Sequence, residues 1–417
     1  MLKYLAGVAV AVLALWPSAA LAAPAWEQWQ SVGGVFDLGG PRSDGSLLVA
    51  GSAALYTLSR DGTLAPFAQG PGGYKDDPGA EAYLAVSPPQ HVASAGCNFM
   101  RDDVYILRLH TPIGITRVSA AGDASGPFDN VSLASLNGIA FDTVGSFDHR
   151  LLATGPVNGK TEVVAIDCTG AVQVITMTAP VVEGGLEVAP SSFGAFGGDL
   201  VAPDELSGVI WAIAPDGSAT QVVSSGLPKG GDIGVESVAF VPSGFTSRGG
   251  FVYYSDRATA GNPHPGTDHV LRLSSADLVA AGVQDGDMLA ATEGGASMID
   301  VRCAATCQVN PVVSTPTTAH GEGHIGITLN PEPSPTPSAS VRQTASKPPS
   351  SSGIGLVGFI IVAVVIAAAL TAFRFWRRRG PATARSFSPP AGCGPLPSAS
   401  PRCSSASTSS VWVFRLS

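Results

Sequence analysis

Short apolar runs that alternate with polar residues recur between residues 34 and 329, and Gly, Asp, Asn or Pro residues separate them. Such alternation is typical of half-buried β-strands, and an Asp-Gly pair between two runs predicts a tight hairpin. The clearest unit has apolar runs at 185–190, 198–202, 208–213 and 219–223. Asp216-Gly217 separates the last two runs, so this unit predicts four antiparallel strands in about 40 residues.

Similar units recur along the chain. They open near Gly34, Glu81, Asn137, Gly185 and Glu236, and a last, degraded unit contains the runs 297–301 and 311–314. We assign the runs 250–254 and 269–273 to the unit that opens at Glu236, and the run 324–329 to a ring-closing strand. A period of about 40–50 residues with four strands per unit is typical of β-propellers. The sequence therefore predicts an all-β, six-bladed β-propeller over residues 23–330, and a pair of non-repeating β-sandwiches is the alternative.

Two longer apolar segments lie near the ends of the chain. Lys3 precedes an apolar run that ends at Trp16, and Ala20-Leu21-Ala22 fits the small-x-small cleavage pattern, so residues 1–22 are predicted to be a signal peptide. An uncleaved anchor is the alternative. Residues 353–373 carry no charge and would span about 30 Å as a helix, which predicts one C-terminal transmembrane helix.

The segments beside this predicted helix differ in composition. Residues 331–352 are rich in Pro, Ser and Thr, which predicts an extended stalk. Residues 374–417 hold seven Arg and no acidic residue, which predicts a basic, disordered cytoplasmic tail. We therefore expect a single-pass protein of the cell membrane with an extracytoplasmic N-terminal domain.

Composition and charge agree with this organisation. The chain has 50 Gly, 33 Pro and only 13% charged residues, which favours short strands and turns over helices. Residues 23–330 hold 13 Lys and Arg against 31 Asp and Glu, which leaves a net charge of −18. An acidic domain of this kind argues against nucleic acid as a partner, because nucleic acid requires a basic surface.

Four of the six cysteines lie in the predicted extracytoplasmic domain, where disulfides are expected. Cys303 and Cys307 are close together in a turn-like stretch, so we predict a local disulfide between them. A disulfide between Cys97 and Cys168 then follows by elimination. Cys393 and Cys403 belong to the predicted cytoplasmic tail and are expected to be reduced.

The repeated pattern also resembles a known family. Strand openings such as Asn137-Gly-Ile-Ala-Phe, followed by Leu-Val-Ala runs and an Asp-Gly turn, are similar to the six-bladed propellers of the gluconolactonase/regucalcin type and to NHL-repeat proteins. The resemblance covers most of residues 34–329. It implies a divalent cation at the propeller axis, held by Glu, Asn and Asp residues where the innermost strands begin.

The matching positions in this chain read Ala82, Asn137, Gly184, Glu236 and Gly323. Asn137 and Glu236 offer oxygen ligands, and Glu183 adds a carboxylate just before its strand. These three are the candidate metal ligands, for Ca²⁺ or another divalent cation. Glu81 and Glu322 hold equivalent places and are candidates to line the same mouth.

Two histidine clusters provide a second hypothesis for a metal site. His320-Gly-Glu-Gly-His324 brings two imidazoles and a carboxylate close together in sequence, and His264 to His269 forms a similar group. Imidazole nitrogens suit Zn²⁺ or copper ions. The sequence contains neither a Gly-x-Ser-x-Gly elbow nor a Walker phosphate loop, so no nucleophile or nucleotide site is indicated.

These observations leave three hypotheses for function. The first is a membrane-anchored propeller that binds an extracellular ligand or protein partner through one face, because the matched set of metal ligands is incomplete. The second is a divalent-metal-dependent, lactonase-like hydrolase, which Asn137 and Glu236 favour. The third is a structural protein of the cell envelope. The fold alone does not choose between them.

Overall fold

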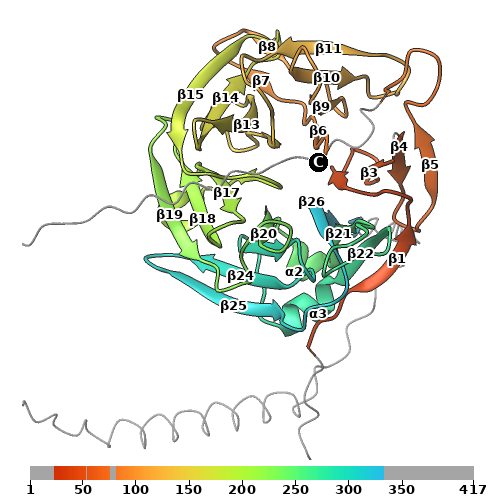
Figure 1. Cartoon of the computed structure of the whole chain (residues 1–417), viewed down its shortest axis with the longest axis vertical. Coiled ribbons are helices and arrows are strands. Elements are labelled where there is room, and N and C mark those ends of the chain that lie inside the picture. Colours follow the sequence, from red (N-terminus) through yellow and green to blue (C-terminus); the bar gives the residue numbers. More distant parts are fainter. Residues whose placement is uncertain (1–22, 53, 76–80, 333–417) are drawn as a thin grey trace, which may run out of the picture. The chain divides into compact units, whose positions relative to one another are not determined.

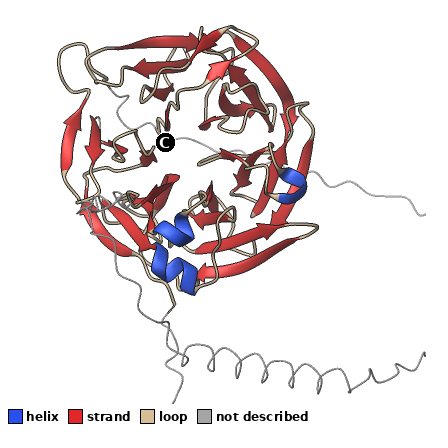
Figure 2. Ribbon diagram, turned by 180° about the vertical axis from the view of Figure 1, so that it is seen from behind, coloured by secondary structure: helices blue, strands red, loops and turns tan. Residues whose placement is uncertain are grey.

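The computed structural model describes residues 23–52, 54–75 and 81–332. Within these ranges the strands form six four-stranded antiparallel sheets arranged around a central axis, as Figure 1 shows. The helices are few and short (Figure 2). The six-bladed β-propeller is therefore confirmed. The predicted signal peptide, transmembrane segment and cytoplasmic tail, and nearly all of the predicted stalk, lie outside the described residues.

The first four blades follow one another along the chain, each from the axis outward. Blade 1 contains β2 (Asp37–Gly39), β3 (Leu47–Gly51), β4 (Ala54–Leu58) and β5 (Leu64–Phe67). Blade 2 contains β6 (Leu84–Val86), β9 (Val104–Arg108), β10 (Gly114–Val118) and β11 (Ser125–Asn130), with a small hairpin of β7 (His91–Val92) and β8 (Cys97–Asn98).

Blade 3 contains β12 (Gly138–Phe141), β13 (Leu151–Val157), β14 (Lys160–Ile166) and β15 (Val172–Ala179). Blade 4 contains β16 (Glu187–Val188), β17 (Leu200–Asp204), β18 (Val209–Ile213) and β19 (Ala219–Ser224), with the 3₁₀ turn η1 (Gly194–Phe196). The strands of the clearest predicted unit, which starts at Gly185, are thus confirmed as one blade.

The last two blades are interleaved along the chain. Blade 5 contains β20 (Val235–Phe240), β23 (Met288–Thr292), β24 (Met298–Cys303) and β25 (Cys307–Val313). Blade 6 contains β26 (Gly321–Leu329), β21 (Gly250–Asp256), β22 (His269–Ser274) and β1 (Glu27–Ser31). The helices α2 (Phe245–Arg248) and α3 (Ser275–Ala280) lie in two of the three connections between these blades.

This arrangement corrects our assignment of strands to the unit that opens at Glu236. The runs 250–254 and 269–273 belong to blade 6, whereas the supposedly degraded unit at 297–314 completes the sheet of β20. Alternation of apolar residues indicates a strand but does not identify the strand with which it pairs. In the structure β20 pairs with β23, with Val235 opposite Thr292. The N-terminal strand β1 pairs with β22 and joins β26 in the ring-closing blade.

A buried ion pair at the axis connects several blades. Asp37 in β2 is fully buried, and its carboxylate accepts hydrogen bonds from the backbone N–H groups of Leu84 and His324, at 2.7 Å each. The His324 ring lies between two acceptors, with Nδ1 2.9 Å from the Asp37 carboxylate and Nε2 2.8 Å from the Ile139 carbonyl. Because both ring nitrogens face acceptors, both donate, and the ring is an imidazolium. The Asp37 charge accordingly raises the pKa of His324 against the opposing effect of burial.

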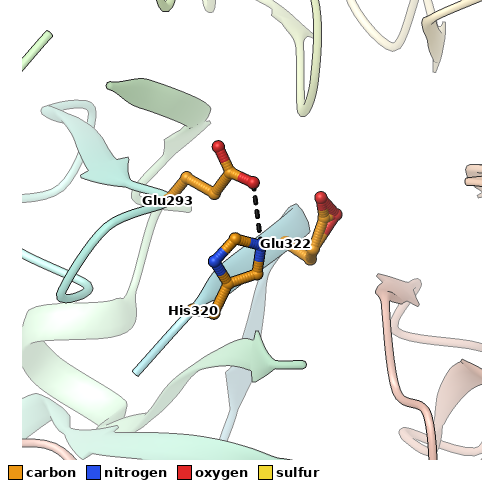
Figure 3. Close-up of side chains that lie close together, drawn as sticks. All are labelled: Glu293, His320 and Glu322. Atoms are coloured by element: carbon orange, nitrogen blue, oxygen red, sulfur yellow. Dashed lines mark ion pairs between the residues drawn. The ribbon is translucent and has the colours of Figure 1, made fainter. Parts of the chain in front are cut away.

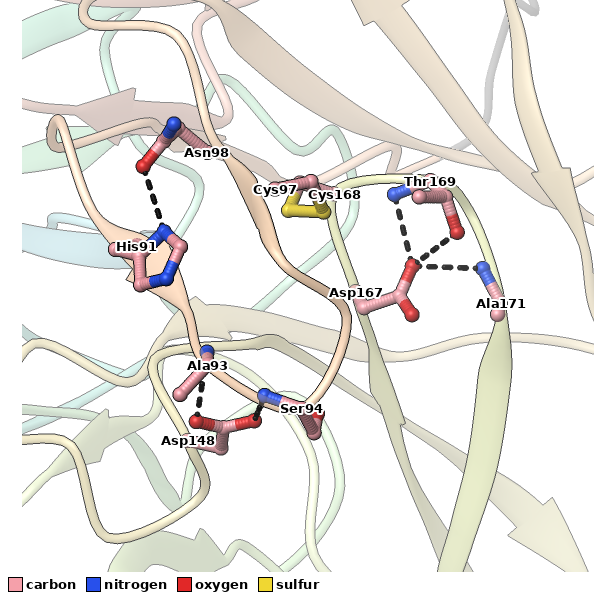
Figure 4. The surroundings of a disulfide bond; sticks show 10 residues. All are labelled: His91, Ala93, Ser94, Cys97, Asn98, Asp148, Asp167, Cys168, Thr169 and Ala171. Carbon is pink, nitrogen blue, oxygen red and sulfur yellow. Dashed lines mark hydrogen bonds between the residues drawn. A yellow bond between two sulfur atoms is a disulfide. The ribbon is translucent and has the colours of Figure 1, made fainter.

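Both predicted disulfides are present among the described residues. Cys97–Cys168 links the β7–β8 hairpin of blade 2 to the turn between β14 and β15 of blade 3 (Figure 4). The bond therefore joins adjacent blades, and Asp148 reinforces the same junction by accepting the backbone N–H of Ser94 at 2.9 Å. Cys303–Cys307 closes the turn between β24 and β25 within blade 5.

The two disulfides should contribute unequally to stability. The sequence separation is 71 residues for Cys97–Cys168 and 4 for Cys303–Cys307, and a longer closed loop restricts the unfolded chain more strongly. We expect the double change Cys97→Ser and Cys168→Ser to lower the free energy of unfolding by about 2–4 kcal/mol in urea titrations. The matched change Cys303→Ser and Cys307→Ser should lower it by less, and an equal or larger loss there would contradict this prediction.

Candidate functional site

An acidic cavity of about 290 Å³ lies at the end of the axis where the innermost strands begin. Its acidic lining residues are Glu81, Glu183, Glu205, Asp232, Glu236, Glu293 and Glu322. Each lies close to an end of a strand of the inner or second row, because the second strand of a blade runs antiparallel to the first and ends where the first begins. The topology of the propeller thus concentrates seven carboxyl groups in one place.

The three candidate ligands from the sequence, Asn137, Glu183 and Glu236, all line this cavity. Glu81 and Glu322 line it as well. Sequence reasoning missed Glu205 and Glu293, which directly follow β17 and β23. A carboxylate immediately after the second strand of a unit is the signal that would have identified both residues.

Both polar atoms of the Asn137 side-chain amide are hydrogen-bonded within the protein. Its Nδ2 donates to the Val182 carbonyl at 3.0 Å, and its Oδ1 accepts from the Thr154 hydroxyl at 3.1 Å. The same residue donates its backbone N–H to the Thr154 carbonyl, and its own carbonyl accepts from Gly184. Asn137 therefore holds blades 3 and 4 together at the rim, and its Oδ1 retains one lone pair toward the cavity.

Glu236 lies deeper and is only 4% exposed. Its Oε1 accepts a hydrogen bond from the Tyr83 hydroxyl at 3.0 Å. Burial, followed by the charges of Glu322, Glu293 and Glu183, raises the pKa of Glu236 well above its usual range. The backbone at Gly184 passes directly over this side chain with a φ of 76°, and a Cβ there would collide with the Glu236 carbonyl. Glycine is thus required for Glu236 to sit in the cavity wall.

Three further carboxyl groups of the cavity are shifted in the same direction. Burial is the largest cause for each, and it raises the pKa values of Glu183, Glu205 and Glu293 to about 7. Contact between the Glu183 and Glu205 carboxyls, and between those of Glu205 and Glu293, adds to the shifts of Glu183 and Glu205. In the absence of a cation, these groups therefore share protons near neutral pH.

Two of the lining residues, Glu293 and Glu322, form a compact group with the buried His320. One potential ligand atom from each lies within 4.8 Å of the others, and Figure 3 shows the three side chains converging. His320 Nε2 lies 2.9 Å from Glu293 Oε1. Burial and the nearby Arg257 lower the pKa of His320, so the ring is neutral and this contact is an N–H···O hydrogen bond.

Within the described part of the chain, two buried atoms of this group have no hydrogen-bond partner, His320 Nδ1 and Glu322 Oε2. His320 is 2% exposed and Glu322 is 3% exposed. The nearest cation is Arg257, whose Nη1 bonds Glu81 at 2.6 Å and lies 3.8 Å from Glu322 Oε2. One guanidinium does not balance seven carboxyl groups, so several carboxylate oxygens of the cavity remain free to bind a ligand.

The prediction that His320 and His324 share one site is wrong. Between them, β26 makes an irregularity opposite β21, where the register moves from Ser255↔Glu322 to Tyr253↔Gly326. Gly323 has a φ of 65° at this point, which interrupts the alternation of the strand. His320 consequently lies at the acidic cavity, whereas the ring of His324 contacts Asp37 in the interior.

The second histidine group is held by the loops around it. His264 Nδ1 lies 2.8 Å from the Thr317 carbonyl, and His269 Nδ1 lies 2.7 Å from the Thr267 carbonyl. Asp268 accepts the backbone N–H of Ala258. These side chains stabilise the irregular connection between β21 and β22, and each has a structural partner.

Comparison with known proteins identifies likenesses of fold. No protein-family model matches the sequence, and no curated protein matches it. Among solved structures, a putative gluconolactonase is 11% identical, with 76% of this chain and 92% of that chain covered and a TM-score of 0.42. A virginiamycin B lyase from Staphylococcus aureus is 10% identical over 71% of this chain and 92% of that chain, with a TM-score of 0.39. A putative TolB from Agrobacterium tumefaciens is 14% identical, with 72% of this chain and 91% of that chain covered and a TM-score of 0.39.

Proposed function

We propose that this domain is a ligand-binding module whose axial cavity holds a divalent cation, and that the cation and the acidic rim together recognise an oxygen-rich ligand. The observation that carries this proposal is the convergence of Glu293, His320 and Glu322, with two of their buried donor atoms lacking a partner. An anionic ligand would reach the cavity only through such a cation, because the wall itself is strongly acidic.

The donor set fits a cation on chemical grounds. Two carboxylates and one neutral imidazole favour Zn²⁺ or a similar transition metal, since imidazole is a poor ligand for Ca²⁺. Two ligands on one tetrahedral ion with bonds of about 2.0–2.2 Å lie roughly 3.4 Å apart, so His320 Nε2 and Glu293 Oε1, which are 2.9 Å apart across their hydrogen bond, would separate slightly as the ion replaces the Nε2 proton. The oxygen set of Asn137, Glu183 and Glu236 would instead favour Ca²⁺.

The alternative is a lactonase-like hydrolase that uses the same cavity. Its specific support is that Glu183, Glu205 and Glu293 titrate near pH 7, where a carboxyl group can both accept and donate a proton. Such a group would remove a proton from an attacking water and return it to the departing hydroxyl. Fold likeness does not decide the matter, because propellers support many functions.

Attachment to the membrane remains part of the proposal. No helix within the described ranges is long and apolar enough to cross a membrane, and the predicted span at 353–373 lies outside them. The inner strand β26 begins beside the acidic cavity and ends at Leu329, at the far end of the axis. The described chain therefore leaves the propeller on the face away from the acidic cavity.

Metal binding should be visible as a change in thermal stability. With the full-length protein stripped of metal, saturating Zn²⁺ should raise the melting temperature by several degrees, because a ligand at about 100 times its Kd adds about 2.7 kcal/mol. Glu322→Gln should abolish this shift while raising the melting temperature of the metal-free protein, since it removes an ionisable group from the crowded acidic cluster. Glu187→Gln, which alters a buried carboxyl at the opposite end of the axis, is the matched control and should retain the shift.

Two other outcomes are informative. A larger shift with Ca²⁺ than with Zn²⁺, lost in Glu236→Gln, would assign the cation to the oxygen set instead. Equal melting temperatures with Zn²⁺, Ca²⁺, Mg²⁺, Mn²⁺ and a chelator would contradict the proposed cation site.

The metal-free protein should lose stability as the pH rises. Glu205 has a folded pKa of about 7 against an ordinary value of 4.5, so its favourable contribution is complete below about pH 4.5 and is lost as the pH passes through 7. Glu183 and Glu293 act in the same direction. We expect the free energy of unfolding to fall by a few kcal/mol, as an order of magnitude, between about pH 6 and pH 8.

Urea titrations with a chelator present would measure this slope. Glu205→Gln should flatten it, whereas Glu332→Gln, at an exposed position, should leave it unchanged. A metal-free protein that becomes more stable between pH 6 and 8 would contradict the assigned carboxyl crowding. The lowered pKa of His320 has the opposite effect, because it makes the folded protein less stable as the pH falls. The slope is therefore measured above pH 6.

Hydrolysis separates the two candidate functions. For a binding module we expect δ-gluconolactone to disappear at the rate of the buffer alone, in a pH-stat assay with Zn²⁺ or Ca²⁺ added. A faster rate that requires the cation and is lost in Glu205→Gln would instead support the hydrolase. Glu187→Gln serves again as the folded control.

A further inference from the structure

A second cavity, of about 470 Å³, lies at the opposite end of the axis, where the innermost strands end. The strand ends that line it are mostly apolar and include Ala85, Val86, Phe141, Phe240, Ile325 and Ile327. Cavities of about 300–1,000 Å³ with apolar walls and a few polar groups are typical of small-molecule sites. We call this the apolar axial cavity.

The ion pair of Asp37 and His324 lies at the inner end of this cavity. His324 lines the apolar axial cavity, while the residue that precedes the bulge, Glu322, lines the acidic one. Both ring nitrogens of His324 are committed, to Asp37 and to the Ile139 carbonyl. The ring therefore offers no free donor, and the two cavities are separate sites of different chemistry.

One carboxyl group in the apolar axial cavity remains available. Glu187 in β16 accepts one hydrogen bond from the protein, from the Phe240 backbone N–H to Oε2 at 2.8 Å. Asp102, the other acidic lining residue, lies at the rim and is occupied by the N–H and hydroxyl of Ser43. Glu187 thus presents a second oxygen, Oε1, for which the structure gives no donor.

Among the described residues, no cationic side chain donates a hydrogen bond to Glu187. Asp37 and Glu187 contribute two carboxylates, and the His324 imidazolium balances one of them. Burial raises the pKa of Glu187 to about 7, against smaller opposing effects of the Phe240 N–H and of His324. An ionised carboxylate in an apolar wall is costly unless it is paired, so a cationic partner would be strongly favoured.

We propose that the apolar axial cavity binds a small monocation with an apolar body, an alkyl- or arylamine, whose ammonium group donates to Glu187. The apolar body packs between Val86, Phe141 and Phe240. The arginines of the rim do not compete for this place, because Arg42 donates to the Ala120 carbonyl at 2.6 Å and stacks over Phe67, while Arg101 is exposed. This proposal is independent of the metal site.

The test is calorimetric titration of the full-length protein at about pH 8, where Glu187 is ionised. The ligands are hexylamine and phenethylamine, with hexanol, phenethyl alcohol and hexanoate as analogues of matched size. Each amine should bind at least about tenfold more tightly than its alcohol, because it adds a charge-assisted hydrogen bond, and hexanoate should bind most weakly.

Three variants locate the binding. Glu187→Gln should bring the affinity for the amine down to that for the alcohol, since Gln keeps the bond from Phe240 but loses the charge. Val86→Phe should weaken amines and alcohols alike, because it fills the apolar axial cavity. Glu183→Gln, a matched change in the acidic cavity, should alter neither.

The proposal is overturned if neither amine binds more tightly than its alcohol to the wild-type protein. It is equally overturned if Glu183→Gln removes the preference and Glu187→Gln retains it, because the amine would then be held by the acidic cavity. Thermal melting of each variant confirms that it is folded, and Val86→Phe provides the same test without any change of charge.

Discussion

The buried pair of Asp37 and His324 is the interaction on which the centre of this propeller depends. Through it, the C-terminal inner strand β26 is fixed to blade 1, and the bonds to Leu84 and Ile139 extend the connection to blades 2 and 3. An isolated buried ion pair contributes little net stability, because desolvation offsets the attraction. Here the Asp37 carboxylate accepts hydrogen bonds from three backbone N–H groups, and these bonds offset the cost of desolvation. The pair therefore holds the inner strands of four blades in register.

The same pair explains why the two ends of the axis differ. Near the start of β26, Glu322 lines the acidic cavity, and after the bulge at Gly323 the ring of His324 lines the apolar one. Burial, followed by repulsion between neighbouring carboxyl groups, raises the pKa values of Glu236 and Glu322 at the acidic end well above their usual range. A divalent cation bound there, as we propose, would relieve this crowding by allowing the carboxyl groups to ionise together.

Much of this structure follows from local sequence pattern. Most strands of blades 1 to 4 coincide with an apolar run, whereas β11, with the sequence Ser-Gly-Pro-Phe-Asp-Asn, does not. Asn137, Glu183 and Glu236 share one cavity because inner strands of a propeller begin at one end of the axis. Pairing between distant strands does not follow from such patterns, so the exchange between blades 5 and 6 could not be predicted. The bulge at Gly323 was equally hidden, since the simple alternation of β26 would place His320, Glu322 and His324 on one face.

The interleaving of blades 5 and 6 has a consequence for the candidate metal centre. In a propeller with consecutive blades, the strand after β20 would be its neighbour, and the residue at the end of that strand would be Arg257 rather than Glu293. Because β21 and β22 cross to blade 6, Arg257 instead lies beside Glu81, and Glu293 at the end of β23 meets His320 through the bridge Gly294↔His320. The crossing therefore places a carboxylate in contact with the imidazole of His320, while Arg257 lies near enough to contribute, after burial, to the lowered pKa of that ring.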